Sequence, residues 1–282
     1  MSLRRQLLKF LEEDLGWGDV TSELLIPEDA LGKGVVIAKE PGIMCGGDEA
    51  KELADLVNLN VKVLKKDGEP FDKGEVLLEL TGSVRNILSV ERVLLNLLAH
   101  MCGVATHTRR IVEKVRRVNP NVRVAATRKT LPGLRFFEKK AVRIGGGDTH
   151  RYDLSSMVLI KDNHIAVLGD VRLAVERAKK LASFAIKVEV EVSNVKDALE
   201  AAKGGADIIM LDNMEPSEIK EVIKTLEAAG LRERLLIEAS GGITEENVVE
   251  YATTGVDIIS IGEITHSARS IDISLDVMIV KE

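Results

Sequence analysis

Positively charged side chains follow two apolar segments in the middle of this chain. Arg128 and Lys129 come directly after the run 124–126, and Lys161 ends the run 157–160. A guanidinium group binds a carboxylate through two parallel hydrogen bonds, whereas a lysine acts as a point charge. If these side chains converge, they suit a substrate with more than one carboxylate. Ordinary surface strands also end in such residues, and Lys161 could simply pair with Asp162.

A second cationic pair, His150-Arg151, follows three consecutive glycines at 145–147. Glycine allows the backbone to approach a ligand closely, although the same run could be only a flexible loop. With Arg128 and Lys161, this pair would give one cationic pocket for an anionic substrate.

Acidic side chains end two later apolar runs. Glu191 closes the run 188–191, and Asp212 closes the run 209–212. Neighbouring strands lie about 4.8 Å apart, so the two carboxylates could face one small group. Such a pair can hold Mg²⁺, accept ribose hydroxyls or stabilise a developing cation; solvent-facing strand ends are the alternative. Glu189 alternates with Glu191, and spacing alone does not say which lies nearer to the ligand.

Glycine turns follow the last two apolar runs. Ser240-Gly241-Gly242 precedes a helix expected from about Thr244, and Gly262 ends the final run. Backbone N–H groups at the start of a helix bind phosphate, and α/β barrels commonly bind it after their last two strands. We therefore expect a phosphate site here, although many non-catalytic turns share this short motif.

The composition limits the class of protein. The chain has 282 residues, 45% hydrophobic and 30% charged, with a formal net charge of −6, which indicates a globular protein without the basic face of a nucleic-acid binder. Two cysteines form no CxxC motif, and the five histidines lack zinc spacing. No apolar stretch approaches about 18 residues, and the N-terminus lacks the apolar region of a signal peptide. We expect a cytoplasmic protein that binds no membrane.

The hydrophobic pattern divides the chain in two. The first part has helical spacing over 3–15, short apolar runs typical of strands, and a capped entry at Ser89 to a helix through His100. Strands and helices then alternate, with strands expected near 122–126, 156–160, 185–191, 206–211, 235–239 and 256–261 and helices over 171–181, 196–203, 216–229 and 245–251.

This alternation predicts a parallel sheet. No GxGxxG follows the first strand, so a TIM-like α/β barrel that is open and incomplete fits better than a dinucleotide-binding sheet. We expect an N-terminal domain over 1–105, rejoined by the C-terminal segment 268–282, and a catalytic barrel domain over 106–267.

In their order, these motifs resemble the quinolinate phosphoribosyltransferase family, also called nicotinate-nucleotide pyrophosphorylase (carboxylating). The resemblance runs over nearly the whole chain, from the segment 13–21 through Glu91-Arg92 and 102–106 to the segment 238–244. It is strongest from Thr127-Arg128-Lys129-Thr130-Leu131-Pro132-Gly133 to Lys161-Asp162-Asn163-His164.

The resemblance implies an N-terminal α/β sandwich and an open α/β barrel of about seven strands. It implies transfer of a phosphoribosyl group from phosphoribosyl pyrophosphate to quinolinate with Mg²⁺. The products are nicotinate mononucleotide, CO₂ and pyrophosphate, in the de novo synthesis of NAD. It also implies a homodimer in which Arg92 completes the partner's site.

The resemblance also implies the role of each site residue. Lys129, Glu191 and Asp212 would be catalytic and would meet the phosphoribosyl pyrophosphate, with Mg²⁺ held through the pyrophosphate and by Glu191 and Asp212. Two family positions differ: Lys140 stands where an aromatic residue is common, and Thr149 where asparagine is common. Quinolinate would bind to Arg92, Thr127, Arg128, His150, Arg151 and Lys161, and phosphate to Ser240, Gly241, Gly242, Gly262 and His266.

Three other functions fit parts of the pattern. A related phosphoribosyltransferase could take nicotinate, although one carboxylate would not use the full cationic set. A paralogue linked to molybdenum transport shares the fold. A non-catalytic anion-binding protein would leave Glu191 and Asp212 without a chemical purpose.

Overall fold

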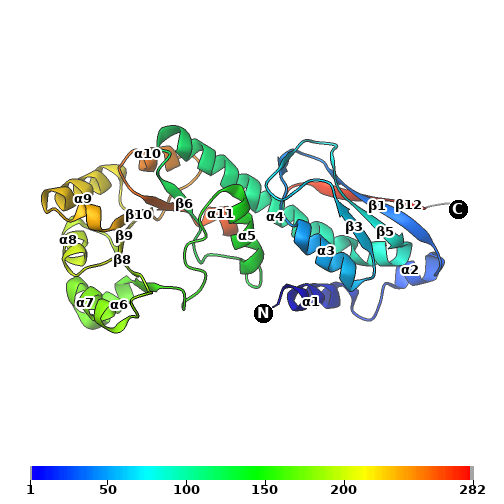
Figure 1. Ribbon diagram of the computed structural model, residues 1–282, viewed down its shortest axis with the longest axis horizontal. Coiled ribbons are helices and arrows are strands. Elements are labelled where there is room, and N and C mark those ends of the chain that lie inside the picture. The colour runs from blue at the N-terminus through cyan, green and yellow to red at the C-terminus, as the bar shows by residue number, and fades with distance from the viewer. Residues whose placement is uncertain (1, 280–282) are drawn as a thin grey trace. The chain divides into compact units, whose positions relative to one another are not determined.

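A computed structural model describes residues 2–279 of the chain and resolves two compact units (Figure 1). The first unit comprises Met1–His107 together with Ala268–Glu282, and the second comprises Thr108–Ser267. From the sequence we expected a division after residue 105 and a return of the chain at residue 268.

The first unit is built on a four-stranded antiparallel sheet in the order β12-β1-β5-β3. Along β1 every second residue is buried, so one face of this strand packs against the core. The strand β12 pairs with β1 over its whole length, which confirms that the C-terminal segment returns to this unit. Its strands are β1 (Leu31–Ala38), β3 (Asn60–Val63), β5 (Val76–Ser83) and β12 (Ile273–Ile279), with β2 (Gly42–Ile43) and β4 (Pro70–Phe71) forming a separate pair.

Helices α1 (Leu3–Leu15), α2 (Val20–Leu25) and α3 (Gly47–Leu56) belong to the same unit, and α1 contacts α3. Within α1, Leu7 and Leu11 are buried, as the helical spacing in the sequence predicts. Layers of helix and sheet thus give the α/β sandwich that the sequence led us to expect.

The helix α4 (Val84–Val118) is longer than predicted. The capped entry at Ser89 is wrong, because the Ser89 hydroxyl donates to the Asn86 carbonyl at 2.9 Å from inside the helix. Gly103 interrupts an otherwise good helix sequence because a Cβ there would overlap the Arg269 carbonyl. By length and composition α4 could cross a membrane, but 61% of its most apolar window is buried, as in the core helix of a globular protein.

The second unit is an open α/β barrel. Its parallel strands, among the described residues, run in the order β6-β11-β10-β9-β8-β7, with β6 and β7 at the two ends. Six strands form this sheet where about seven were expected, and Asp148 adds only a single bridge to Ala125. The strands are β6 (Arg123–Ala125), β7 (Val158–Ile160), β8 (Val188–Val192), β9 (Ile208–Asp212), β10 (Leu236–Ser240) and β11 (Ile258–Ser260).

Helices separate these strands, and side-chain caps fix several of their starts. Asp170 caps α7 (Val171–Leu181), and Asn194 caps α8 (Val195–Lys203), each by accepting a backbone N–H. A proline at the first turn opens α9 (Pro216–Ala228). The other helical segments are α5 (Arg135–Gly145), α6 (Asp162–Leu168), the 3₁₀ turn η1 (Arg232–Arg234), α10 (Val248–Ala252) and α11 (Glu263–His266).

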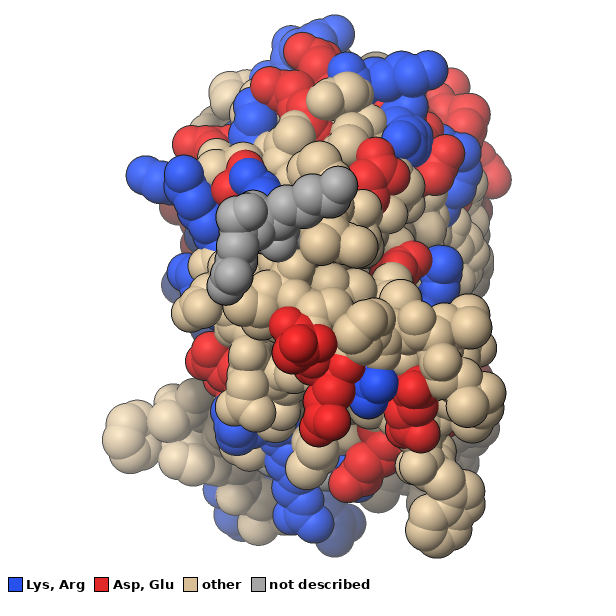
Figure 2. Space-filling model, turned by 90° about the vertical axis from the view of Figure 1, so that its right-hand side faces the viewer, with Lys and Arg blue, Asp and Glu red and all other residues tan. Residues whose placement is uncertain are grey.

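Charge is mixed on the face that Figure 2 shows. Lys and Arg side chains alternate with Asp and Glu side chains around a central area of other residues. Among the described residues, this face therefore presents no field of a single sign.

Candidate active site

One cavity of about 520 Å³ lies in the barrel unit, where the strands of the sheet end. Parallel strands direct their carboxyl ends to the same edge of the sheet, and functional groups of α/β barrels gather there. The roles assigned to the lining residues stay predictions, but the structure brings eleven of them together. These are Thr127, Arg128, Lys129, His150, Arg151, Lys161, Glu191, Asp212, Ser240, Gly241 and Gly242.

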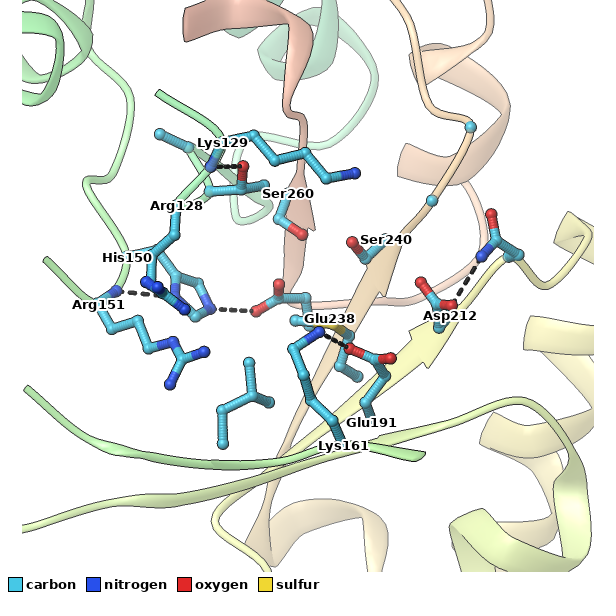
Figure 3. A pocket seen from close by; sticks show the side chains of 17 residues that line it. Arg128, Lys129, His150, Arg151, Lys161, Glu191, Asp212, Glu238, Ser240 and Ser260 are labelled. Atoms are coloured by element: carbon cyan, nitrogen blue, oxygen red, sulfur yellow. Dashed lines mark hydrogen bonds and ion pairs between the residues drawn. The ribbon is translucent and has the colours of Figure 1, made fainter. Parts of the chain in front are cut away.

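Basic side chains gather at one end of this cavity, which we call the cationic end after its two arginines (Figure 3). Arg128, His150 and Arg151 lie together there in the close view. Burial, together with the charge of Arg128, holds the pKa of Arg151 below its usual value. The Nε atom of Arg128 is buried and has no hydrogen-bond partner within the described part of the chain. An unpaired buried donor is costly, so this end of the cavity is prepared for an anion.

The loop that carries His150 and Arg151 is held by buried polar contacts. His150 has a positive φ of 53°, and its backbone N–H donates to Asp148 Oδ1 at 2.9 Å. The Lys139 ammonium, from α5, donates to the carbonyls of Thr149 and Arg151 on either side of that corner. Burial and then the charge of Arg135 lower the pKa of Lys139 to about 8. None of these three hydrogen bonds involves the side chain of residue 149, the position where the family commonly has asparagine.

The His150 ring contacts two glutamates that are wholly buried. Its Nε2 lies 3.0 Å from Glu238 Oε2 and 3.4 Å from Glu189 Oε2. Burial lowers the pKa of His150, but the hydrogen bonds and charges of Glu189 and Glu238 outweigh burial and raise the pKa to about 10. Burial is also the main cause that raises the pKa of Glu189. Glu189 therefore contacts the His150 ring, whereas Glu191 lines the cavity.

The acidic side chains lie toward the other end. Lys161 directly precedes α6, and its ammonium pairs with Glu191 Oε2 at 2.6 Å, so the alternative Lys161–Asp162 pair is not what the structure shows. Asp212 accepts a hydrogen bond from the Asn213 side chain at 2.7 Å. A neighbouring cavity is lined by both Glu191 and Asp212. Asp162 and Asp197 also line it, but among the described residues the one acidic group whose ligand atoms converge is His150 with Glu189 and Glu238.

The glycine turn after β10 differs from the prediction. The helix expected from residue 245 begins only at Val248, because the N–H of Thr244 donates to Asn247 Oδ1 and that of Glu245 to Glu263 Oε1. Those N–H groups are thus already used. Gly241 and Gly242 themselves line the cavity, both with positive φ, so the turn and not a helix start faces the cavity.

Lys129 is fixed from both sides of its backbone. Its N–H donates to Thr127 Oγ1 at 3.0 Å, and its carbonyl accepts from Thr265 Oγ1 on α11 at 2.7 Å. A Cβ at Gly262 would lie 3.2 Å from Lys129 Cδ and 3.1 Å from His266 Nε2. Gly262 therefore allows the lysine stem and the histidine to pass close to this turn, although neither Gly262 nor His266 lines the main cavity.

Sequence reasoning missed three polar residues that line the cavity: Glu238, Ser260 and Asn213. Glu238 sits inside an apolar run, and a charged residue at such a position was the signal available for it. Asn213 follows Asp212 with a positive φ of 53°, a conformation that asparagine tolerates better than most residues. Arg92 lies in the first unit, where its guanidinium is 3.8 Å from Glu91, and its contribution to a partner's site stays a prediction.

Comparison with protein families gives two matches that together span most of the chain. Residues 19–102 match the N-terminal domain of quinolinate phosphoribosyl transferase, and residues 104–276 match its C-terminal domain. The junction between the two matches falls within α4, a few residues before the division between the two structural units.

Named relatives are similar to this chain over nearly its whole length. The chain is 50% identical to a probable nicotinate-nucleotide pyrophosphorylase [carboxylating] of Methanocaldococcus jannaschii, with 96% of both chains covered. It is 40% identical to the Bacillus subtilis protein of the same name, with 100% of this chain and 96% of that one covered. The crystal structure of NadC from Streptococcus pyogenes superposes with a TM-score of 0.92, at 36% identity over 99% of this chain and 97% of that chain. The chain therefore belongs to the quinolinate phosphoribosyltransferase family.

Proposed function

We propose that this chain is a pentosyltransferase that joins quinolinate to the ribose of phosphoribosyl pyrophosphate. The reaction releases pyrophosphate and CO₂ and gives nicotinate mononucleotide for NAD synthesis. One observation carries the proposal: a single cavity has arginines and a histidine at one end and carboxylates with a Ser-Gly-Gly turn at the other. The family membership supports the same reaction.

Quinolinate binds at the cationic end. Its two carboxylates face Arg128 and Arg151, whose planar guanidinium groups match carboxylate geometry. The unpartnered Nε of Arg128 gains the acceptor that it lacks in the protein alone. Lys161 lies between the two ends (Figure 3). A substrate carboxylate can attract the Lys161 ammonium away from Glu191. The Glu191 carboxylate is then free to face the ribose.

Phosphoribosyl pyrophosphate binds at the opposite end. Its 5′-phosphate meets the turn at Ser240, Gly241 and Gly242, whose backbone approaches the ligand without interference from a Cβ. The carboxylates of Glu191 and Asp212 accept the ribose hydroxyls. Lys129, with its backbone held by Thr127 and Thr265, offers its ammonium to the departing pyrophosphate.

Chemistry at this site is mainly a matter of positioning and charge. The pyridine nitrogen attacks C1 of the ribose as pyrophosphate leaves, and positive charge develops on the sugar and then on the ring. Glu191 and Asp212 stabilise that charge, and Lys129 stabilises the negative charge of the leaving group. The finished pyridinium then makes loss of the adjacent carboxylate feasible, because the electron pair left on carbon sits beside a cationic nitrogen.

Mg²⁺ would reach this site held mainly by the pyrophosphate of the substrate. Asp212 is the better placed of the two predicted protein ligands, because Glu191 already pairs with Lys161. When bound, the ion neutralises charge on the pyrophosphate. The positioning of Lys129 and Asp212 comes from protein contacts alone.

One assay separates this function from the alternatives. Quinolinate labelled in its 2-carboxyl group is incubated with the enzyme, Mg²⁺ and phosphoribosyl pyrophosphate, and labelled CO₂ is counted. Release that requires phosphoribosyl pyrophosphate supports the proposal. Turnover of nicotinate but not quinolinate would indicate a nicotinate enzyme, and binding without turnover would indicate an anion-binding protein or a non-catalytic paralogue.

The homodimer is part of the same proposal. If Arg92 acts in the partner's site, Arg92→Ala and Arg151→Ala homodimers are each impaired, but a mixture that exchanges subunits regains activity in the hybrid's one intact site. No recovery after verified exchange would place Arg92 outside the partner's site. The cytoplasmic location stays a prediction.

A further inference from the structure

Glu238 is a buried carboxylate for which the reaction as described has no use. It lies on β10, paired with β9 and β11 on either side, two residues before the Ser240-Gly241-Gly242 turn. The residue is 0% exposed, yet its side chain is among those that line the cavity. A carboxylate in such a position is costly unless it is paired, and its one hydrogen-bond partner within the described residues is His150.

The His150 ring is held at both of its nitrogens. Nε2 lies 3.0 Å from Glu238 Oε2, and Nδ1 accepts the backbone N–H of Arg151 at 2.7 Å. A nitrogen that accepts a hydrogen bond cannot also carry a proton, so the ring's proton is on Nε2 and is donated to Glu238. The two glutamates favour a second proton, as the raised pKa of His150 indicates, but that proton would have to displace the Arg151 N–H. The contact with Arg151 therefore requires a neutral ring, against the direction in which the two glutamates shift the pKa of His150.

These two bonds form a chain of contacts across the cavity (Figure 3). Glu238 holds the ring, and the ring holds the backbone of Arg151, whose guanidinium lies at the cationic end. Strand β10, which ends at Ser240, thus also holds the loop that carries His150 and Arg151 at the opposite end of the cavity. With both nitrogens engaged, His150 has no ring N–H to give to a substrate carboxylate.

We propose that Glu238 is a positioning residue: through the Nε2–H tautomer of His150 it holds the backbone of Arg151 in the geometry that binds the dicarboxylate substrate. The proposal rests on the quinolinate-binding role of Arg151 given above. Glu189, 3.4 Å from the same Nε2, lies farther from the ring nitrogen than Glu238 and does not line the cavity.

The first test reads the ring directly. The protein is labelled with ¹³C and ¹⁵N at histidine, and His150 is assigned among the five histidines by comparison with His150→Gln. At pH 7.5 the wild-type ring should show the neutral Nε2–H tautomer, and Glu238→Ala should lose this fixed tautomer. A doubly protonated ring in the wild type, or an unchanged His150 signal in Glu238→Ala, would overturn the proposal.

The second test reads the substrate. Glu238→Ala should raise the KM for quinolinate about tenfold, the size expected for a buried donor that loses its acceptor, with the KM for phosphoribosyl pyrophosphate within about twofold. Glu238→Gln keeps an acceptor oxygen and should stay within about threefold of the wild type for quinolinate. Glu49→Gln is the matched control, since Glu49 is 1% exposed but belongs to α3 of the first unit.

Two kinetic results would contradict a positioning role. An equal rise of both KM values in Glu238→Ala would indicate a general structural defect, and Glu238→Gln as impaired as Glu238→Ala would indicate that charge matters and not the acceptor. If Glu238→Ala does not fold, Glu238→Asp takes its place, because it withdraws the carboxylate by one methylene. If Arg151→Ala leaves the quinolinate KM unchanged, the binding role of Arg151 fails, while the tautomer still tests the contact with Glu238.

Discussion

The two ends of the cavity are built in different ways. At the acidic end, where we propose that phosphoribosyl pyrophosphate binds, Glu191, Asp212 and Ser240 sit at or near the carboxyl ends of paired strands. At the cationic end, Arg128 and Arg151 lie on irregular loops after the strand β6 and the helix α5. Strand register fixes the first group, whereas buried side-chain contacts from Lys139 and Glu238 fix the second.

This difference predicts how each end responds to mutation. A residue at a strand end can be replaced without moving its neighbours, because the backbone ladder remains. A change in the loops can move several ligands together, because their positions depend on a few buried polar contacts. Substitutions of the strand-end carboxylates should therefore alter mainly kcat, and substitutions around the cationic end should alter quinolinate binding.

The largest effect is expected for Asp212→Ala. Removal of a carboxylate that stabilises developing positive charge should lower kcat by about 100-fold to 1,000-fold, the range measured when one preorganised electrostatic group is lost. The dissociation constant for quinolinate, measured by calorimetry, should change little. Asp212→Asn keeps the shape and tests the charge. An unchanged kcat in both variants would remove the proposed role of Asp212.

A smaller effect, confined to binding, is expected for Arg128→Ala. Loss of a charge-assisted hydrogen bond should weaken quinolinate binding by about 10-fold to 100-fold, with phosphoribosyl pyrophosphate affinity preserved. Arg128→Lys keeps the charge but not the paired geometry, so it should fall between Arg128→Ala and the wild type. Titration calorimetry with each ligand measures the difference, and equal losses for both ligands would contradict the division of the cavity into two ends.

The strand-borne half of the site was predictable from the sequence. Apolar runs that end in Glu191, Asp212 and Ser240 place those residues on one edge of a parallel sheet, and the cavity contains all three. The helix α7 begins and ends at the predicted residues, because its apolar spacing and the Asp170 cap agree. For such elements the local pattern and the tertiary packing favour the same structure.

The contacts that hold the loops were not predictable. Lys139 looks like one of several charged residues on a helix, and nothing local indicates that its ammonium is buried under the carbonyls of Thr149 and Arg151. The helix expected after Gly242 begins late because Asn247 and Glu263 take the N–H groups in the turn. Both contacts are made by side chains to backbone groups outside their own helical turn. The hydrophobic periodicity of a sequence carries no information about such contacts.

A moderate effect is expected for Gly241→Ala. Gly241 has φ of 91°, and a Cβ there would overlap the Asn213 side chain and backbone, so both strain and contact oppose the substitution. A conformational cost of about 1–2 kcal/mol predicts a KM for phosphoribosyl pyrophosphate raised about tenfold. Gly242→Ala is the control for strain alone, because φ is 63° and nothing lies within 4 Å of its added Cβ. If the two variants behave alike, contact with Asn213 does not matter.

The smallest effect concerns the pH dependence of stability through Lys139. The pKa of its ammonium is lowered from 10.5 to about 8 by burial first and then by Arg135. Between these values the unfolded chain keeps a proton that the folded chain has lost, so the free energy of unfolding rises with pH. The unfavourable burial of the charge is fully present below about pH 8 and is relieved above it.

Lys139→Met removes this titration and keeps most of the side-chain volume. Urea unfolding at pH 7 and pH 9.5 should show that the stability of the wild type relative to Lys139→Met increases at the higher pH. Lys180→Met, at an exposed position on α7, is the control and should show no such change, because the Lys180 side chain lies in solvent. A pH-independent difference between wild type and Lys139→Met would mean that Lys139 keeps its proton throughout. The loop at the cationic end would then be held by a Lys139 ammonium that stays charged at every pH tested. The hydrogen bonds of that ammonium would not depend on pH, and neither would the stability of that end relative to the strand-borne end.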